Sequence, residues 1–171
     1  MIIKDALDYI QPTKYLVKST DYNNKYPIPV LTAGKTFILG YSNETEGIYP
    51  SSKSPVLLFD DFTGDIKYVD FDFKIKSSAA KIIIPKNSSQ NIKYYFYLLK
   101  HRKIISTEHQ RLWISKVSNL SIQEVNSSVQ ASIVSVLDNI NESINLKNKQ
   151  LAHLDELIKS RFIRKEVFKY A

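Results

Sequence analysis

The last part of the chain restricts the possible folds most, because residues 126–171 contain no glycine and no proline. Apolar residues recur there at alternating spacings of four and three, and Lys147 takes the one polar position. The apolar positions are Ile133, Leu137, Ile140, Ile144, Leu151, Leu154 and Ile158. This spacing is typical of a coiled-coil seam. We therefore expect one long helix whose seam pairs with another helix; the alternative is a helix that folds back onto its own domain.

The helix is expected to begin at Ser127, where Ser127-Ser-Val-Gln130 has the pattern of a capping box. Running to about Phe162 at ~1.5 Å per residue, it would be on the order of 50 Å long. The sequence thus predicts three parts: a domain over residues 1–125, a helix over 126–162 and a tail over 163–171.

Residues 1–125 hold every glycine, every proline and 16 of the 19 Tyr and Phe residues. Runs rich in β-branched and aromatic residues predict strands over 28–32, 55–59, 65–71 and 81–84. Helical spacing predicts an amphipathic helix over 91–103, and polar turn residues predict loops over 42–54 and 87–90. The expected fold class is α+β: a compact mixed domain followed by one long C-terminal coiled-coil helix.

Composition excludes several classes of protein. The chain has no cysteine, so disulfides, thiolate nucleophiles and cysteine-ligated metals are excluded. No apolar run approaches the ~18 residues of a membrane span, and the N-terminus lacks the pattern of a signal peptide, so we expect a cytoplasmic protein. A net charge of +7 favours a polyanionic partner.

Thr32-Ala33-Gly34-Lys35-Thr36 ends like a phosphate-binding P-loop. The match fails because Pro29 stands where the first glycine belongs, and the residues that follow resemble a strand rather than a helix. We interpret the segment as a turn between two strands in which Gly34 permits a positive φ. Lys35 and Thr36 at its tip remain candidates for contact with a DNA phosphate.

An acidic cluster, Asp60, Asp61 and Asp65, precedes Lys67. Such carboxylates can hold Mg²⁺ in a nuclease, but all of them fall within one tight turn marked by Gly64, so aspartates capping backbone amides are the favoured interpretation. A Mg²⁺-dependent nuclease stays open as an alternative. The three histidines show no metal-ligand spacing, and we expect neither a metal site nor a cofactor.

Two other segments are candidates for contact with nucleic acid. His109, Arg111 and Trp113 alternate, so in an extended segment they would share one face and present a stacking, cationic surface; the alternative is that Trp113 anchors the core. The stretch from Lys74 to Lys81 concentrates lysines and hydroxyls, as phosphate contacts require. Methyl transfer is excluded, because the chain has neither a glycine-rich S-adenosylmethionine loop nor an Asn/Asp-Pro-Pro-aromatic motif.

Several motifs resemble, in order, one target-recognition domain of the type I restriction-modification specificity subunits. They are Tyr9–Tyr15, Pro29–Tyr41, Phe59–Thr63, Val69–Lys74 with Lys76–Ala79, and His109-x-Arg111-x-Trp113-Ile114-Ser115. The segment Leu154–Phe162 resembles the end of the spacer helix that follows such a domain. The family usually has a Pro-Pro stretch before the glutamine of this helix, whereas this chain has Glu124-Val125-Asn126.

The resemblance implies a role as well as a fold. Members carry two recognition domains and two antiparallel helices, read a bipartite double-stranded DNA sequence, and bind methyltransferase (modification) and restriction subunits. This chain has one domain and one helix, so it looks like a half-subunit that forms a homodimer through antiparallel helices.

We therefore expect a non-catalytic DNA-specificity component with no membrane association. The candidate DNA contacts, chosen by charge and loop placement, are Lys35, Thr36, Tyr41, Lys53, Lys76, Ser77, Lys81, His109, Arg111 and Trp113. The alternatives are the Mg²⁺ nuclease and a coiled-coil module for protein interaction.

Overall fold

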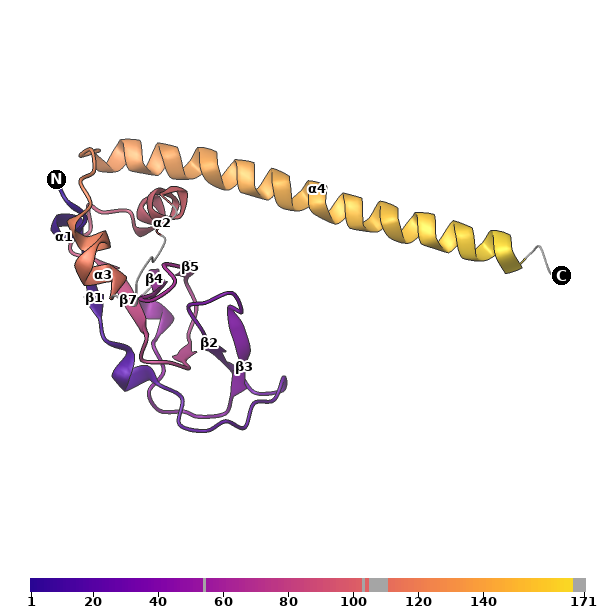
Figure 1. Ribbon diagram of the computed structural model, residues 1–171, viewed down its shortest axis with the longest axis horizontal. Helices are drawn as coiled ribbons and strands as arrows, with labels where there is room; N and C mark the ends of the chain where they lie inside the picture. The colour runs from indigo at the N-terminus through magenta and orange to yellow at the C-terminus, as the bar shows by residue number, and fades with distance from the viewer. Residues whose placement is uncertain (54, 103, 105–110, 168–171) are drawn as a thin grey trace. The chain divides into compact units, whose positions relative to one another are not determined.

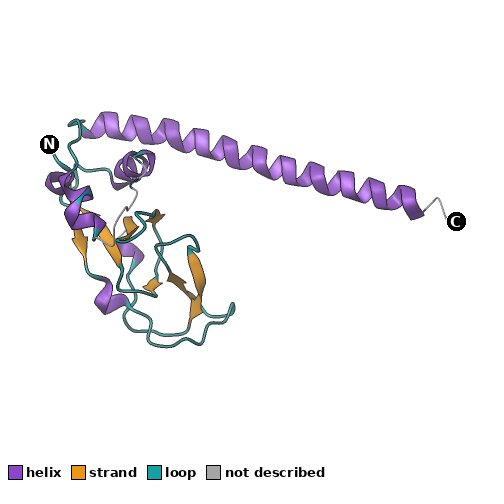
Figure 2. Ribbon diagram, viewed as in Figure 1, coloured by secondary structure: helices purple, strands orange, loops and turns teal. Residues whose placement is uncertain are grey.

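The computed structural model describes residues 1–53, 55–102, 104 and 111–167, with side chains as far as Arg161. The chain divides into two units, Met1–Ala131 and Ser132–Ala171. Figure 2 shows that the described strands all belong to the first unit, whereas the described residues of the second unit are helical. The predicted α+β class, with a mixed domain and a long C-terminal helix, is confirmed.

The larger sheet has the strand order β1-β7-β4-β5, and every pair in it is antiparallel (Figure 1). Its strands are β1 (Leu7–Ile10), β4 (Val56–Asp60), β5 (Ile66–Val69) and β7 (Ala80–Pro85). The strands predicted over 55–59, 65–71 and 81–84 are therefore confirmed, with small shifts at their ends.

The smaller sheet has the order β3-β2-β6, with β2 (Ile28–Leu31), β3 (Ile38–Ser42) and β6 (Lys74–Ile75). β2 and β3 form an antiparallel hairpin, whereas β2 and β6 are parallel. The predicted turn between strands at residues 32–36 is confirmed, because the Thr32 N–H donates to the Phe37 carbonyl at 3.0 Å. The positive φ expected at Gly34 is wrong: among the described glycines only Gly47 and Gly64 have one.

Short helices complete the domain. The predicted helix over 91–103 is α2 (Ile92–His101), and Asn91 caps it by accepting from the backbone N–H groups of Lys93 and Tyr94. The others are α1 (Ile3–Ala6), η1 (Pro12–Tyr15), η2 (Ser51–Lys53), α3 (Leu112–Ser115) and η3 (Val117–Asn119).

Strand β4 lies between two hydrophobic cores. Leu57 and Phe59 join a core that contains Tyr95 of α2 and Trp113 of α3. The alternate residues Val56 and Leu58 join a second core, which also contains Phe73 and residues of the smaller sheet. Both faces of this strand are therefore covered, which explains why its sequence is apolar from Val56 to Phe59.

The long helix α4 spans Ser127–Val167. Its cap lies one residue before the predicted one, because the Asn126 carboxamide oxygen accepts from the Val129 N–H at 3.0 Å. The predicted capping box is wrong, since Gln130 turns into the domain instead. The helix also continues past Phe162, where the sequence had suggested a tail. No helix among the described residues is long and apolar enough to cross a membrane.

Gln130 is buried, at 2% exposure, and both polar atoms of its side chain are engaged within the first unit. Its side-chain oxygen accepts from the Asn91 N–H at 2.8 Å, and its side-chain nitrogen donates to the Val125 carbonyl at 2.8 Å. The first turn of α4 is therefore joined to the start of α2 by hydrogen bonds.

Candidate nucleic-acid interface

Three polar segments meet at one end of the two sheets: the β2–β3 turn (residues 32–37), the β4–β5 turn (60–65) and the segment after β6 (76–79). A Cβ on Gly34 would lie 3.8 Å from an oxygen of Asp60, which places the first two turns in contact. The Asp61 N–H donates to the Ala79 carbonyl at 3.2 Å, and the Lys76 N–H donates to the Leu31 carbonyl at 2.9 Å. We call the exposed residues of these segments the three-turn surface.

The three-turn surface is basic and rich in hydroxyls. Lys35 and Thr36 are exposed at the β2–β3 turn, and Lys76 and Ser77 are exposed after β6. The Lys76 ammonium lies 5.5 Å from the centre of the Tyr22 ring, and it is in neither of the two ion pairs found among the described residues. Four of the ten predicted DNA contacts are thus brought together, in a form suited to phosphate binding.

Asp60 holds the β4–β5 turn rather than a metal ion. One of its carboxylate oxygens accepts from the backbone N–H groups of Phe62 and Thr63, both at 2.9 Å. The Asp60 backbone closes the same turn, since its N–H donates to the Asp65 carbonyl at 2.8 Å. This is the turn chemistry that the sequence favoured.

Asp61 points inward and is engaged on both oxygens. One accepts from the Trp113 N–H at 2.8 Å, and the other lies 3.2 Å from the Lys81 ammonium. Among the described residues no group of three or more His, Cys, Asp or Glu side chains is placed to hold a metal ion. The nuclease alternative therefore has no support in the geometry.

Lys81 and Trp113 do not belong to the three-turn surface, which corrects two of the predicted contacts. Lys81 is 3% exposed, because it pairs with Asp61 and lies 4.5 Å over the Tyr9 ring. Trp113 is 2% exposed and packs edge-on against Phe59 with ring centres 5.6 Å apart. Both residues are core components, so the alternative interpretation of Trp113 is the correct one.

The expected shared face of His109, Arg111 and Trp113 is also corrected. Trp113 lies in α3, so it does not continue an extended segment. Arg111 is exposed just before that helix, and His109 lies outside the described residues.

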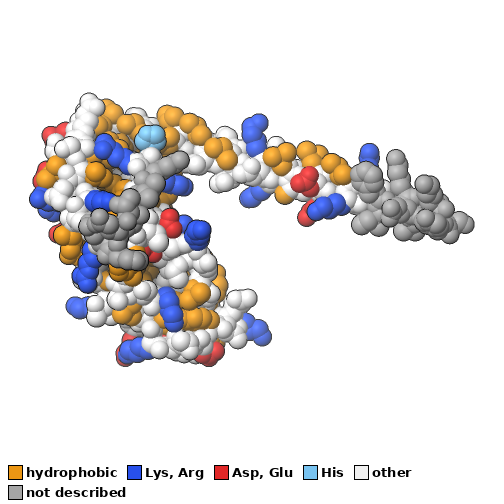
Figure 3. Space-filling model, in the orientation of Figure 1, with side chains coloured by type: hydrophobic (Ala, Val, Ile, Leu, Met, Phe, Trp, Pro, Cys, Tyr) orange, Lys and Arg blue, Asp and Glu red, His pale blue; other side chains and the backbone are white. Residues whose placement is uncertain are grey.

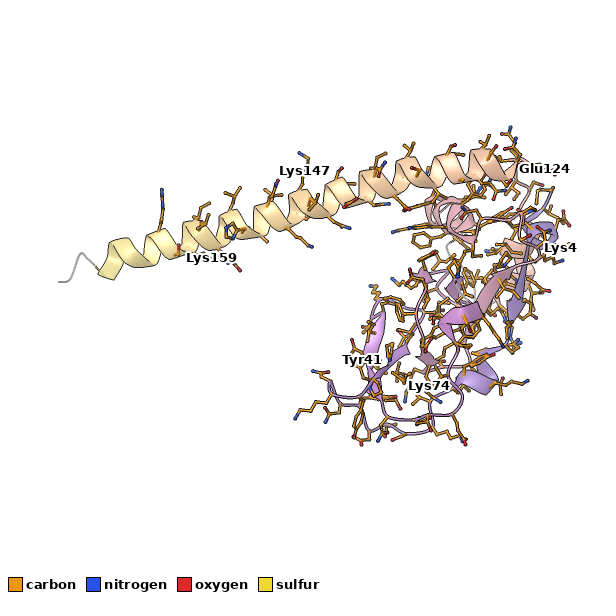
Figure 4. The ribbon with its side chains drawn as sticks, turned by 180° about the vertical axis from the view of Figure 1, so that it is seen from behind. Lys4, Tyr41, Lys74, Glu124, Lys147 and Lys159 are labelled. Atoms are coloured by element: carbon orange, nitrogen blue, oxygen red, sulfur yellow. The ribbon has the colours of Figure 1, made fainter. Side chains whose placement is uncertain are left out.

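Two further candidates, Tyr41 and Lys53, lie in parts of the domain outside the three turns. Tyr41 (Figure 4) pairs with Pro29 at the far end of the β2–β3 hairpin and is half-buried. Lys53 is exposed in η2, where the preceding Ser51 N–H is bound by Asp72. Neither residue contacts the three-turn surface through any interaction seen in the described chain.

Lys74, one of the lysines of the basic stretch, is instead a buried structural residue, at 1% exposure (Figure 4). It pairs with Glu44 at 2.9 Å and donates to the carbonyls of Glu46 and Gly47. Burial alone would raise the pKa of Glu44, but hydrogen bonds from the Ser19 N–H, the Lys74 ammonium and the Lys18 N–H outweigh it and lower the pKa. The pair fixes the loop that follows β3.

Sequence reasoning missed Phe62, which is 46% exposed at the tip of the β4–β5 turn, and its exposed neighbour Thr63. The interpretation of this turn from the sequence rests on its carboxylates alone. A large aromatic residue between Asp61 and the turn glycine Gly64 was the signal that could have identified it.

The seam of α4 is largely uncovered from Ile140 onward. Its apolar residues are each about half exposed: Ile140 49%, Ile144 49%, Leu151 60%, Leu154 53% and Ile158 54%. Figure 3 shows apolar side chains following one another along this helix. Ile133 and Leu137, at the beginning of the seam, are half-buried.

Comparisons with known proteins agree with this architecture. The family model of the type I restriction modification DNA specificity domain matches residues 3–156. The type I restriction enzyme EcoR124I/EcoR124II specificity subunit of Escherichia coli is 46% identical over an alignment of 159 residues, and the match covers 83% of this chain and 39% of the relative.

Solved structures show the same fold at low identity. The S subunit of a type I restriction-modification system from M. genitalium matches with a TM-score of 0.62 at 14% identity, over 83% of this chain and 38% of its own. A structure described under complex assembly and conformational transition of the type I R-M system matches with a TM-score of 0.64 at 14% identity, over 93% of this chain and 42% of its own. The chain spans about two-fifths of the length of these relatives.

Proposed function

Because this chain belongs to the type I restriction-modification DNA specificity domain family, we propose that it is a sequence-specific DNA-binding component without a catalytic site of its own. The observation that carries the proposal is the three-turn surface, where backbone hydrogen bonds hold exposed lysines and hydroxyls side by side. Of the acidic residues beside it, Asp61 is paired with Lys81 in the core, and Asp60 accepts from two backbone N–H groups of its own turn.

Recognition uses two kinds of contact, one to the phosphates and one to the bases. Lys35 and Lys76 neutralise phosphates, and the hydroxyls of Thr36 and Ser77 fix the register of the domain on the duplex. Residues 1–131 carry 17 Lys and Arg against 12 Asp and Glu, which favours encounter with a polyanion. The bases themselves are read by side chains of the turns that reach into a groove.

The helix supplies the second half of the proposal. The exposed seam of α4 pairs with the same helix of a second copy, antiparallel, so that two identical domains read the two halves of one site. Such a dimer recognises an inverted repeat with a fixed spacer. Methyltransferase and restriction subunits in the cytoplasm supply the chemistry on the DNA.

Selection from a randomised DNA duplex pool tests recognition, using the full chain together with its presumed methyltransferase subunit. We expect enrichment of an inverted pair of short motifs at constant separation. A single unpaired motif would keep DNA recognition but refute the homodimer. No enrichment would refute DNA specificity and leave a module for protein interaction.

A pair of matched variants tests the helix. Ile140→Asp with Leu151→Asp places two charges in the seam, and the expected result is a monomer by native mass spectrometry. Asn145→Asp with Ala152→Asp adds the same two charges on the other side of the helix, at positions that are also exposed, and is expected to keep the dimer. An unchanged mass for the seam variant would refute the paired helices.

A further inference from the structure

Phe62 stands out on the three-turn surface because its neighbours there are polar. It is 46% exposed at the tip of the β4–β5 turn, next to the exposed Thr63. Single exposed apolar residues are common on proteins and need no explanation by themselves. Phe62 differs from such residues in how firmly its turn is held and in the groups that surround it.

The backbone of the turn is fixed from three sides. Asp60 accepts from the Phe62 N–H itself at 2.9 Å. One residue earlier, the Asp61 N–H donates to the Ala79 carbonyl at 3.2 Å, and the Asp61 carbonyl accepts from the Leu112 N–H at 2.9 Å. Gly64 has a φ of +79°, and a Cβ there would lie 2.3 Å from the Ile104 carbonyl oxygen. Phe62 is therefore presented by a turn that has little freedom to move.

The two flanking segments, which carry the candidate phosphate-binding groups, both contact this turn. Gly34, next to Lys35, approaches Asp60, and Ala79, in the segment that begins with Lys76 and Ser77, bonds to Asp61. A duplex held by these groups would place a groove against the tip. Phe62 would then face the edges of the bases.

A phenyl ring neither donates nor accepts a conventional hydrogen bond, so it can distinguish bases only by apolar contact. In the major groove the C5-methyl group of thymine is the apolar group that differs among the base pairs. We propose that Phe62 reads a thymine methyl group in the DNA target. This inference rests on the proposed DNA-binding function and adds a residue that determines specificity.

An apolar side chain can also act as a wedge that unstacks a base step in the minor groove. Such a wedge has to insert most of its ring between base pairs. About half of the Phe62 side chain is covered by its own domain, so only part of the ring is available. Contact with a methyl group at a base edge needs no more than that part.

The test begins from the DNA site selected by the full chain with its methyltransferase subunit. Each thymine of that site is replaced in turn by deoxyuridine, which removes only the methyl group. At one position in each half-site we expect the affinity of the unaltered protein to fall about 4-fold, the value of one buried methyl group. Phe62→Ala should bind both DNAs equally, at the lowered affinity.

Three variants complete the design. Phe62→Leu keeps an apolar contact and should keep the preference for thymine. Ile114→Ala removes a different exposed apolar side chain, on α3, and should respond to deoxyuridine as the unaltered protein does. Lys35→Ala should bind more weakly to every sequence, with the selected motif unchanged and a smaller dependence on salt.

The inference is overturned if the selected motif has no thymine, if deoxyuridine has no effect at any position, or if Phe62→Ala shows the same loss as the unaltered protein. Uniformly weaker binding by Phe62→Ala, with less DNA bending and no effect of deoxyuridine, would assign a wedge instead. Failure to select any motif is a different result, because it refutes the proposed function as a whole.

Discussion

Removing the Asp61 carboxylate should destabilise the first unit strongly. Asp61→Ala leaves the Lys81 ammonium at 3% exposure without its partner at 3.2 Å and leaves the Trp113 N–H without its acceptor at 2.8 Å. Breaking a buried ion pair by deleting one member costs about 3–5 kcal/mol, because an uncompensated charge stays buried. We expect the free energy of unfolding to fall by that amount.

A double variant separates the charge from the packing. Asp61→Asn with Lys81→Met removes both charges and keeps an amide oxygen that can accept from the Trp113 N–H. Replacing a buried pair by uncharged groups of similar size is often close to neutral, so the double variant should recover most of the stability lost in Asp61→Ala. The cation–π contact of Lys81 with Tyr9 is lost as well, at a cost of about 0.5–2 kcal/mol.

The assay is urea unfolding followed by the fluorescence of Trp113. This is the only tryptophan of the chain, and it packs in the core directly beside the pair. A loss below about 1 kcal/mol in Asp61→Ala would refute the reasoning, because an exposed pair is worth that much or less. Mg²⁺-dependent DNA cleavage that disappears in a fully stable Asp61→Ala protein would restore the nuclease hypothesis.

Two further predictions use the same fluorescence assay. The pKa of Glu44 is lowered in the folded protein, so the contribution of Glu44 to stability is complete above its ordinary pKa of 4.5 and is lost as the pH falls below that value. Glu44→Gln should therefore lose less stability than the unaltered protein over that acidic range. An unchanged dependence of stability on acidic pH would contradict the pairing with Lys74. Gly64→Ala forces a Cβ to within 2.3 Å of a carbonyl oxygen at a φ of +79° and should cost at least about 1–3 kcal/mol. Gly34→Ala, whose nearest neighbour would be 3.8 Å away, is the matched control and should cost less.

The parts of the fold that the sequence predicted are those encoded by local patterns. Strands β2, β4, β5 and β7 are runs of β-branched and aromatic residues, and α2 and α4 have helical spacing. Strand β6 was missed because it has two residues, Lys74 and Ile75, and exists through parallel pairing with a strand more than forty residues earlier. No local sequence pattern predicts pairing with so distant a strand.

The candidate site was predicted only in part for the same reason. Lys35 and Lys76 lie in exposed turns, as expected from the turn residues around them. Lys81 has the same local appearance, yet it is buried because Asp61 stands opposite it on a neighbouring segment. The charge of a lysine in the sequence does not show whether the residue lies on the surface or pairs with a carboxylate far away in the chain. A tryptophan near an arginine in the sequence is likewise compatible with the core and with the surface.

The burial of Gln130 has a practical consequence for exchanging recognition domains between related chains. A domain cut at residue 125, where the composition changes, would lose the oxygen that accepts from the Asn91 N–H, and an unsatisfied buried donor costs about 1–3 kcal/mol. A graft that retains residues up to Ala131 brings this hydrogen bond with it. The junction for exchanging domains therefore lies inside α4, one turn after the helix begins. A chimera joined there would keep the hydrogen bonds that attach the donor domain to the helix, together with the DNA preference of that domain.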